Sequence, residues 1–200
     1  MTISASQVAE LRQKTGVGMM EAKKALIAVD GDIDKAIEEL RKSGAAKAAK
    51  KAERVTAEGR AHCYAHATGK IGVVVEVLCE TDFVARNELF IEFCNDVAMH
   101  IAAMRPLYLT REEVPEELIA KEREILKDQL LQEGKPENMV DQILEGKLNK
   151  FFSDIVLFEQ PFIKDEDLTI RELLEKKILS LGENLKIHRF HRVEVGEGLV

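Results

Sequence analysis

The first 42 residues repeat apolar side chains at the three- and four-residue spacing of short amphipathic helices. Ser4 and Gln7 have the spacing of a capping box, which predicts the start of the first helix, and Gly16 can end it. Asp32 has the position of an N-cap for the third helix. The apolar positions of the three helices are Val8, Leu11, Ala22, Ala25, Leu26, Val29, Ile33, Ile37 and Leu40. Because helices this short are marginal alone, residues 1–42 are expected to form a compact three-helix domain.

This domain is expected to be similar in fold to a ubiquitin-associated domain, and its second helix begins with two methionines. Met19 and Met20 would point about 100° apart, so one is expected in the core and the other on the surface. An exposed methionine is an adaptable contact for a partner, whereas two core methionines would only fill space. Lys23 and Lys24, one turn on, are interpreted by themselves as solvated charges.

A basic segment follows the three-helix domain. Residues 41–54 contain six basic residues, one acidic residue and no large apolar side chain. Residues 43–56 are therefore predicted to be a basic Ala/Lys linker, partly helical and without a buried face. Such an arm could instead contact nucleic-acid phosphates, although no aromatic side chain lies between its lysines to stack on bases.

From residue 57 the apolar positions change to the alternation of β-strands. Strands are predicted at 60–67 and 71–79, joined by a turn at Thr68–Lys70, and a third strand at 185–195. Between them, helical spacing returns over residues 88–104, 118–131, 136–155 and 169–182. Residues 57–200 are therefore expected to form an α+β core, with a small antiparallel sheet and helices on one side.

Composition narrows the class of partner. The formal net charge is −7, so neither a nucleic-acid coat nor a polybasic membrane anchor is expected. No apolar run approaches the roughly 20 residues of a membrane span, and the first residues do not have the pattern of a secretory signal. The three cysteines, Cys63, Cys79 and Cys94, suggest no disulfide framework. We expect a cytoplasmic protein without direct membrane or nucleic-acid contact.

The sequence shows no catalytic motif. It lacks the P-loop, the GxGxxG fingerprint, the HExxH helix and the GxSxG elbow. Cys63 with His66, and His188 with His191, would fall on opposite faces of a strand, so no metal site is expected from them. With no nucleophile near a recognisable base, the protein is expected to be neither an enzyme nor dependent on a cofactor.

The connection between the second strand and the next helix is harder to explain as structure alone. It reads CETDFVARN over residues 79–87, with Asn87 as the expected N-cap of the helix. A large aromatic, Phe83, stands beside the charged Asp82 and could act as a wedge between packed elements of a partner. Alternatively, Phe83 packs under the sheet and Asp82 caps the turn.

Several long motifs occur along the chain: LRQKTGVGMMEAKKAL, KIGVVVEV, ETDFVARN, AMHIAAMRP, EQPF at Glu159–Phe162, and HRFHRVEVGEG. Together, and in this order, they resemble the motifs of the elongation factor Ts family over essentially the whole chain. The resemblance implies a guanine-nucleotide exchange factor that works without a cofactor. Its partner would be the GTPase elongation factor Tu, from which it would promote release of GDP and so regenerate the GTP form for protein synthesis.

The resemblance also implies roles for particular residues. The family inserts a short segment between helices of the GTPase's nucleotide domain and so disturbs its Mg²⁺ site; the matching residues here are Thr81, Asp82, Phe83 and Val84. Further contacts with the same partner are implied for Met19, Met20, Lys23, Lys51 and His100. In this scheme Lys51 lies in the linker that approaches the GTPase, and His100 presses on the GTPase from the core.

The chain is similar to the short members of the family. Long members carry a duplicated half-core and a coiled-coil hairpin, whereas here the TDFV segment, residues 81–84, leads straight into the helix that ends in AMHIAAMRP. For the short form, the resemblance implies a homodimer whose two cores together replace the missing half. A single half-core also leaves sheet surface or a sheet edge uncovered, which a second copy can cover.

Two other functions stay open on the residues alone. The protein could be an adaptor that only docks partners through Met19 and Met20, or an RNA-binding protein that uses its basic linker. The TDFV segment favours exchange over the adaptor, and the net charge of −7 argues against RNA.

Overall fold

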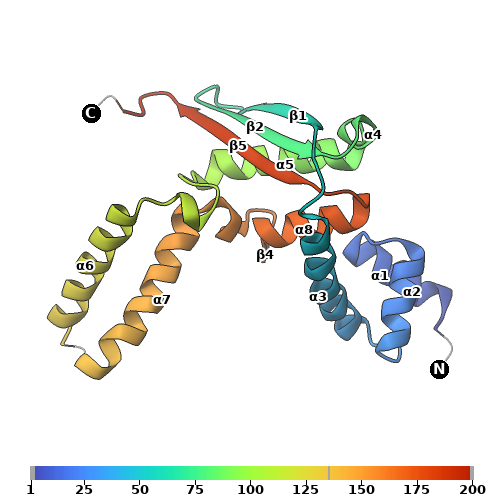
Figure 1. The fold of residues 1–200 in the computed structure, drawn as a ribbon, viewed down its shortest axis with the longest axis horizontal. Helices are drawn as coiled ribbons and strands as arrows, with labels where there is room; N and C mark the ends of the chain where they lie inside the picture. Colours follow the sequence, from blue (N-terminus) through green and yellow to red (C-terminus); the bar gives the residue numbers. More distant parts are fainter. Residues whose placement is uncertain (1–2, 135, 199–200) are drawn as a thin grey trace. The chain divides into compact units, whose positions relative to one another are not determined.

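The structure is a computed structural model that describes residues 3–134 and 136–198. It divides into two compact units, one holding the chain up to Met99 together with Arg171 onward, and the other holding His100–Ile170. The predicted α+β class is confirmed: three N-terminal helices precede a small antiparallel sheet packed with helices (Figure 1).

The helices are α1 (Ala5–Thr15), α2 (Met19–Ala28), α3 (Ile33–Lys51), α4 (Asp82–Ala85), α5 (Glu88–Met104), α6 (Glu116–Gln132), α7 (Glu137–Ile155) and α8 (Ile170–Leu181). The strands are β1 (Glu58–Ala65), β2 (Ile71–Cys79), β3 (Pro161–Phe162), β4 (Asp165–Thr169) and β5 (Lys186–Glu194), and Arg111–Glu113 and Leu157–Glu159 form short 3₁₀ turns. None of the described helices combines the length and the apolar character that a membrane span needs.

The three N-terminal helices begin where the sequence predicted. Ser4 and Gln7 form a complete capping box: the Gln7 N–H donates to Ser4 Oγ over 3.2 Å, and the Ser4 N–H donates to Gln7 Oε1 over 3.0 Å. Gly16 ends α1 with a φ of 72°, and Asp32 caps α3 by accepting the backbone N–H of Lys35 over 3.0 Å. The buried cluster of this bundle consists of Val8, Leu11, Val17, Ala22, Ala25, Leu26, Ala36 and Leu40.

The third helix does not end near residue 42. It continues to Lys51, through the segment interpreted from the sequence as a linker without a buried face. Gly44 and Ala48 lie buried on one side of α3, and a Cβ on Gly44 would lie 3.6 Å from Leu179 Cδ2 of α8. Small side chains four residues apart share a helix face and allow close approach, so this segment buries a face without any large apolar residue. The prediction that this linker has no buried face was therefore wrong, and independent folding of residues 1–42 stays a prediction.

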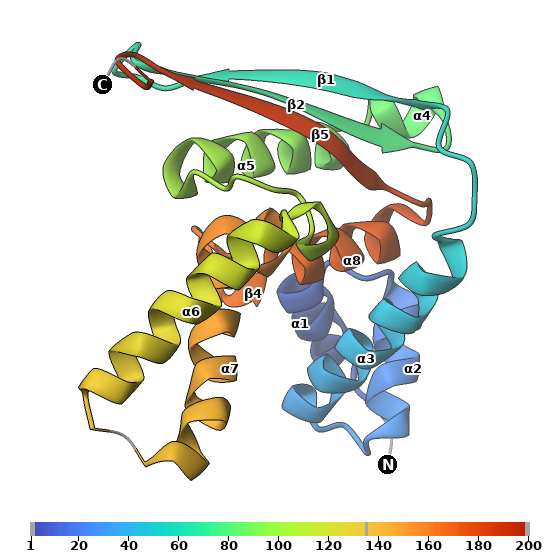
Figure 2. The ribbon, with the colours of Figure 1, turned by 60° about the vertical axis from the view of Figure 1, so that its left-hand side comes forward.

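The main sheet has the strand order β1-β2-β5, and both pairings are antiparallel. Figure 2 shows α5 running along one face of the sheet. Val73, Val75 and Val77, which alternate along β2 and so share one face, are buried. We call the opposite side the outer face. By strand register it carries Ala61, Cys63, Ala65, Gly72, Val74, Glu76, Arg189, His191 and Val193. All of these except Gly72 and Glu76 are exposed, and Cys63, Val74 and Val193 are among the exposed ones.

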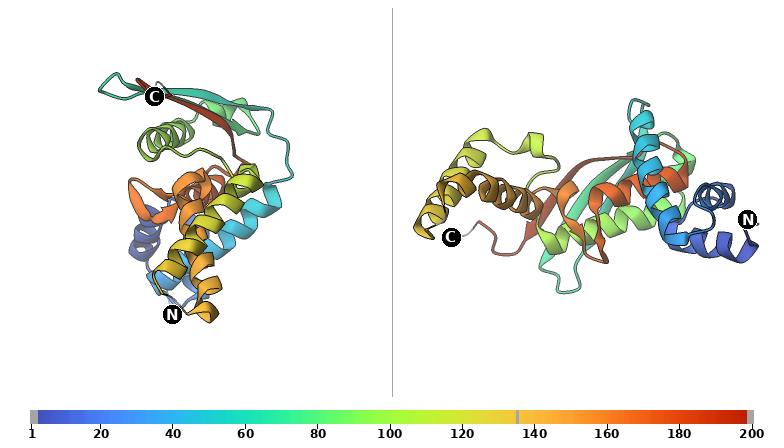
Figure 3. Two further views of the ribbon diagram at one scale, coloured as in Figure 1. Left: turned by 90° about the vertical axis from the view of Figure 1, so that its left-hand side faces the viewer. Right: turned by 90° about the horizontal axis from the view of Figure 1, so that it is seen from below.

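The second unit contains a hairpin of two long helices (Figure 3). α6 and α7 pack through an apolar cluster that consists of Leu130, Val140, Leu144 and Leu148. Arg123 and Glu145 add an ion pair of 3.0 Å between the two helices. The sequence resembles the short members of the family, which differ from the long members by lacking a coiled-coil hairpin. A helical hairpin is nevertheless present, because both predicted helices are long and carry matching apolar stripes.

Candidate partner-binding site

The segment singled out in the sequence forms a single helical turn after β2. Thr81 has an extended backbone and caps α4, because its Oγ1 accepts the backbone N–H of Val84 over 3.4 Å. Asp82 pairs with Arg86, one turn on, over 3.1 Å. The expected loop is therefore a capped turn, and Thr81 rather than Asp82 provides the cap.

Phe83 points away from the protein, since 83% of its surface is exposed. Ala85, two residues on, is buried, and α4 packs against β1 and β2. Residues two apart on a helix lie about 200° apart, so burying Ala85 turns Phe83 toward solvent. The alternative in which Phe83 packs under the sheet is therefore wrong. An exposed aromatic on a fixed turn is suited to insertion into a partner.

A carboxylate from a distant part of the chain holds the start of this turn. Glu183, between α8 and β5, accepts the backbone N–H groups of Glu80 and Thr81 on Oε2, each over 3.1 Å. Its Oε1 accepts the Thr81 hydroxyl over 2.6 Å. In return, Glu80 Oε1 accepts the Asn184 N–H over 2.6 Å, and this bond lowers the pKa of the Glu80 carboxyl. The turn is thus anchored on its N-terminal side.

Lys51, at the end of α3, is tied to the same connection. Its Nζ donates to the Gly182 carbonyl over 2.5 Å, and loss of hydration lowers the pKa of the ammonium group. The Asn184 side chain donates to the Arg54 carbonyl over 3.0 Å and to the Ala52 carbonyl over 3.4 Å. The structure therefore brings Lys51 and Thr81 to one junction, where the Lys51 ammonium is already engaged within the chain.

Both methionines of α2 are exposed, so the expectation that one of them is in the core was wrong. Val17, just before the helix, and Ala22 occupy the buried positions instead. Met20 and Ile27 stand seven residues apart and share a face, with the exposed Lys23 between them. α2 thus carries an apolar surface with two positive charges, because the exposed Lys24 lies one turn from Met20 on the same face, and the rest of the described bundle leaves this surface uncovered.

His100 belongs to the second unit and is fully buried. Its Nε2 lies 3.0 Å from Gln160 Oε1, and its Nδ1 accepts the backbone N–H of Ile163 over 3.4 Å. Burial lowers the pKa of the imidazole to about 4. In the protein alone the imidazole is therefore enclosed, and the direct contact with a partner that the resemblance implied stays a prediction.

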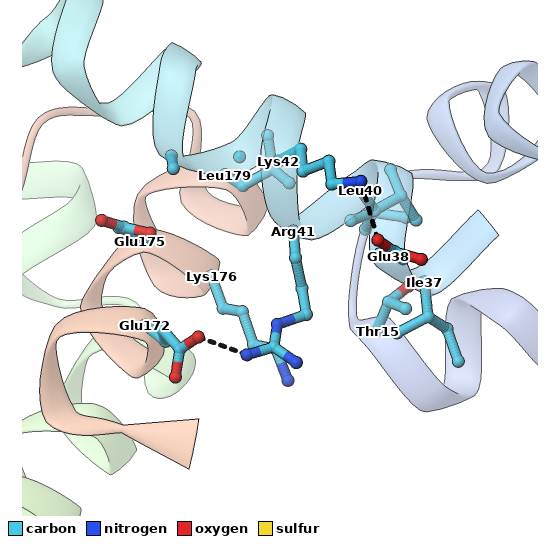
Figure 4. Close-up of a pocket in the computed structure, with 13 residues that line it drawn as sticks. Thr15, Ile37, Glu38, Leu40, Arg41, Lys42, Glu172, Glu175, Lys176 and Leu179 are labelled. Carbon is cyan, nitrogen blue, oxygen red and sulfur yellow. Dashed lines mark hydrogen bonds and ion pairs between the residues drawn. The ribbon is translucent and has the colours of Figure 1, made fainter. Parts of the chain in front are cut away.

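A cavity of about 410 Å³ lies between α3 and α8 (Figure 4). Its apolar wall is formed by Val17, Ile37, Leu40 and Leu179. Arg41 and Glu172 form an ion pair across it, and burial raises the pKa of Glu175. The Thr15 hydroxyl is engaged with the Leu11 carbonyl. The lining offers charges of both signs but no nucleophile beside a base. In the described ranges no cluster of three or more His, Cys, Asp or Glu residues is arranged to hold a metal ion.

Sequence reasoning missed Glu183 and Asn184. The available signal was local: Gly182 ends a helix and the next strand follows closely, so the connection carries a carboxylate and an amide. Such side chains often bind free backbone groups near turns. Nothing in the local sequence shows, however, that their partners lie about a hundred residues earlier in the chain.

Comparison with known proteins gives matches that cover nearly the whole chain. Residues 4–197 match the family model described as Elongation factor TS. A protein named elongation factor Ts from Carboxydothermus hydrogenoformans is 54% identical over 98% of this chain and 91% of its own length. The relative of the same name from Acetivibrio thermocellus is 55% identical over 98% of this chain and 92% of its own. A third, from Moorella thermoacetica, is 54% identical over 99% of this chain and 98% of its own. With a family model matched over residues 4–197 and relatives at 54–55% identity over nearly the whole chain, this chain belongs to the elongation factor Ts family and is a translation elongation factor.

Proposed function

We propose that this protein is a guanine-nucleotide exchange factor for elongation factor Tu. It binds the GDP-bound GTPase, promotes release of GDP by disturbing the partner's Mg²⁺ and phosphate site, and so regenerates the GTP form for protein synthesis in the cytoplasm. The observation that carries the proposal is the exposure of Phe83 on a capped and anchored turn.

Exchange needs opposed binding of two ligands to the GTPase rather than bond chemistry. A factor that binds the empty GTPase more tightly than the GDP-bound form must, by reciprocity, weaken the binding of GDP. The Mg²⁺ of a GTPase bridges phosphate oxygens and is the largest local charge, so moving the ion or its ligating loop weakens the whole phosphate clamp. The exchange factor then requires neither a catalytic group nor a cofactor of its own.

Asp82 and Phe83 have complementary roles in this proposal. Phe83 supplies the apolar surface that inserts between helices of the GTPase, and burial of one such side chain yields about 1.5–3 kcal/mol. Asp82 brings a negative charge toward the Mg²⁺ site, where it competes with the phosphates for the ion. Shifting a two-state equilibrium from about 1:99 to 99:1 requires about 5.5 kcal/mol of differential binding, so this pair needs further contacts.

The exposed face of α2 supplies such contacts in our proposal. Met19 and Met20 are flexible apolar side chains that adapt to a partner surface, and Lys23 adds a positive charge beside them. The Lys51 ammonium group is already bound to the Gly182 carbonyl. We therefore assign Lys51 to the edge of the contact surface rather than to its centre. His100 contributes from the interior, by fixing the segment of Gln160–Ile163 rather than by touching the GTPase.

Release of a fluorescent GDP analogue from elongation factor Tu tests the proposal. The labelled complex is mixed with excess unlabelled GDP in a stopped-flow instrument, with and without this protein. The release rate should rise with the concentration of the protein and then saturate, and a small amount of protein should serve many GTPase molecules. Added Mg²⁺ should slow the stimulated reaction, because it restores the ion that the factor displaces. A release rate that the protein leaves unchanged at saturating binding would overturn the proposal.

The release experiment separates exchange from an adaptor, and an RNA-retention assay separates exchange from RNA binding. An adaptor that docks through Met19 and Met20 would bind the GTPase or another protein without accelerating release. An RNA-binding protein would retain RNA in a salt-dependent manner. Three of the four lysines in the basic segment 41–54 are already engaged within the chain, which argues against RNA binding: Lys42 pairs with Glu38, Lys47 with Glu21, and Lys51 binds the Gly182 carbonyl.

A homodimer is part of the proposal, and the outer face of the sheet is its interface. α5 covers one face of the sheet (Figure 2). On the outer face, Cys63, Val74 and Val193 are exposed. Glu76 and Arg189, paired over 2.6 Å on this face, would border the apolar patch. A second copy can cover an apolar sheet face by two-fold symmetry, the commonest arrangement of oligomers.

Oligomeric state and thiol reactivity test this interface together. Val74→Glu should convert the dimer to a monomer in analytical ultracentrifugation under reducing conditions. Ile125→Glu, at a residue of α6 with 42% exposure against 44% for Val74, is the matched control and should leave the dimer intact. In the dimer Cys63 should react slowly with a thiol reagent, and in the Val74→Glu monomer rapidly. Cys79 and Cys94 should stay unreactive in both, because burial raises the pKa of their thiols to about 11 and about 12. A wild-type monomer at micromolar concentration would contradict the interface.

A further inference from the structure

We propose that Glu183 is a positioning residue for the exchange reaction: it fixes the Asp82–Phe83 turn and ties that turn to the end of α3. This inference rests on the proposed function, because it assigns to a residue outside the contact surface the task of keeping the wedge in place. The connection of Gly182–Asn184 then serves as the junction between the wedge and the N-terminal helices.

Four hydrogen bonds join the two sides of the junction. Glu183 accepts three of them, from the N–H groups of Glu80 and Thr81 and from the Thr81 hydroxyl, and Glu80 accepts the fourth from the Asn184 N–H. The Glu80–Thr81 segment donates three of the bonds and accepts the fourth, so neither segment can slide along the other without losing several bonds. Bonds to a carboxylate are stronger than those between neutral groups.

The turn needs this outside support because it cannot support itself. α4 has four residues, and a helix of one turn is not stable alone. Its cap is a bond of 3.4 Å from Val84 to Thr81, and Thr81 is also the residue that Glu183 holds. Fixing Thr81 by its N–H and its hydroxyl therefore fixes the first residue of the turn, and with it the direction in which Phe83 projects.

Phe83 can displace helices of the GTPase only if the turn that carries it keeps its position during insertion. Insertion of Phe83 pushes the turn back toward its own sheet, and a loosely held turn would rotate rather than displace helices of the GTPase. Functional groups generally need a supporting layer that holds them to within about 0.5 Å. The four bonds of the junction provide such a layer directly behind Asp82.

The junction also holds the end of α3. Lys51 Nζ donates to the Gly182 carbonyl over 2.5 Å, and the buried Asn184 side chain donates to the Arg54 carbonyl over 3.0 Å. In Figures 1 and 2, α4, the end of α3 and the start of β5 lie at the same end of the sheet. The same connection thus holds the wedge and the helix that leads to the Met19–Met20 surface. Both proposed contact surfaces can then meet the GTPase in a fixed relative position.

Three variants of the full-length protein test this inference. Glu183→Ala removes all three accepted bonds. Glu183→Gln keeps an oxygen that can accept the two N–H groups and an amide that can bond Thr81, so it is the conservative replacement. Glu53→Ala removes an exposed glutamate of the same region that makes none of the four bonds, and is the matched control.

The first measurement uses the protein alone. In hydrogen–deuterium exchange, Glu183→Ala should speed exchange at the Glu80 and Thr81 amides by about tenfold or more, whereas Glu183→Gln should keep most of the protection. Glu53→Ala should leave these amides as they are in the wild-type protein. Unchanged protection in Glu183→Ala would overturn the inference, whatever the protein does to the GTPase.

The second measurement separates positioning from binding. With labelled GDP on elongation factor Tu, Glu183→Ala should lower the maximal release rate by about tenfold, while the half-saturating concentration changes by less than about threefold. Glu183→Gln should recover most of the maximal rate. Equal maximal rates for Glu183→Ala and the wild-type protein, or an equal loss in Glu53→Ala, would overturn the inference.

Two further results distinguish a failure of this inference from misfolding of the variant and from a failure of the proposed function. If Glu183→Ala melts more than about 5 °C below the wild-type protein, Glu183→Asp replaces it, because its carboxylate is charged but too short to reach all three donors. A wild-type protein that does not stimulate release at all would instead overturn the proposed function, a result distinct from an active wild type with equally active variants.

Discussion

His100 and Gln160 form a closed hydrogen-bonded pair in the interior of the second unit. The Gln160 amide nitrogen donates to the carbonyls of Asp154 and Met104, so its oxygen is the acceptor for His100 Nε2, 3.0 Å away. The other ring nitrogen, Nδ1, accepts the N–H of Ile163. Both ring nitrogens are therefore used by the neutral imidazole, and a second proton on the ring would have no acceptor.

This pair predicts a loss of stability in mild acid. The unfolded chain binds a proton near the ordinary histidine pKa of 6.5, whereas the folded chain does so only near 4, so unfolding takes up a proton as the pH falls through this window. Between pH 7 and pH 5 the free energy of unfolding should fall by about 2 kcal/mol through His100. Urea titrations at both values, compared between the wild-type protein and His100→Gln, measure this term.

Only the difference between the two proteins isolates His100, because carboxylates also titrate toward pH 5. A His188→Gln variant, changed at an exposed position of β5, controls for the loss of a histidine as such. The same pH slope in the wild-type protein and in His100→Gln would show that the buried ring contributes nothing to the acid sensitivity.

Replacing Asp82 and Phe83 by alanine should leave the fold intact and slow the release of GDP. Phe83 is exposed and the Asp82–Arg86 ion pair lies at the surface, so neither holds the core together. The free energy of unfolding should change by less than about 0.5 kcal/mol. Thermal melting and stopped-flow release, measured on the same preparation, check both halves of the prediction.

A matched aromatic in the core provides the contrast. Phe90 of α5 is fully buried, so Phe90→Ala should cost about 3–5 kcal/mol of stability. A comparable loss in the Asp82–Phe83 double variant would mean that Phe83 packs inside the protein in solution.

Gly59 allows β1 to cross close to β2, and its replacement should be costly. Its φ is 154°, and a Cβ there would lie 2.3 Å from the Val77 carbonyl oxygen and 2.8 Å from Leu78 Cα. Because both neighbours are backbone, Gly59→Ala should lower the free energy of unfolding by at least about 2 kcal/mol. Gly69→Ala, at a positive φ with open space around it, should cost only about 1 kcal/mol. Chemical denaturation of both variants decides whether the close approach matters.

Gly44 should accept a small side chain and reject a large one. A Cβ at this position meets Leu179 at ordinary van der Waals distance, so Gly44→Ala should raise the free energy of unfolding by about 0.5–1 kcal/mol through the helix backbone. Gly44→Leu should instead cost about 1–3 kcal/mol, because it forces α3 away from α8. In α7, Gly146 has open space around it, so Gly146→Leu should lack this penalty. Equal effects of leucine at both positions would place α3 apart from α8 in solution.

The sequence predicted those elements whose signals are local. The capping box at Ser4, the left-handed Gly16 and the alternation of Val73, Val75 and Val77 each act within a few residues, and each is found in the structure. The extent of α3 could not be read in this way. The second half of α3 is buried partly by Leu179, which lies close to Gly44. The sequence around residue 44 contains no signal of this distant neighbour.

The residues of the candidate site also fall into those explained by local sequence and those that depend on distant partners. Phe83 was singled out from its own neighbours, and its exposure follows from a turn that Thr81 caps locally. Both readings of the two methionines failed, because Val17 fills the space that one of them was expected to occupy. The roles of His100 and Glu183 depend on partners 60 and about a hundred residues away, so only the folded structure reveals them.

The position of β5 in the sheet sets the order in which the functional surface can form. β1 and β2 are joined by a short turn, whereas Glu76 of β2 and Arg189 of β5 pair across 113 positions of sequence. Closing a loop of that length is slower than closing a hairpin, so β5 is expected to add to a hairpin already formed. Glu183 lies three positions before the first residue of β5, so it is expected to reach Glu80 and Thr81 only when that strand is in place. If Phe83 acts as proposed, the turn that carries it becomes anchored only once β5 has joined the sheet, and a chain caught before that stage would present Phe83 on a turn without its anchor.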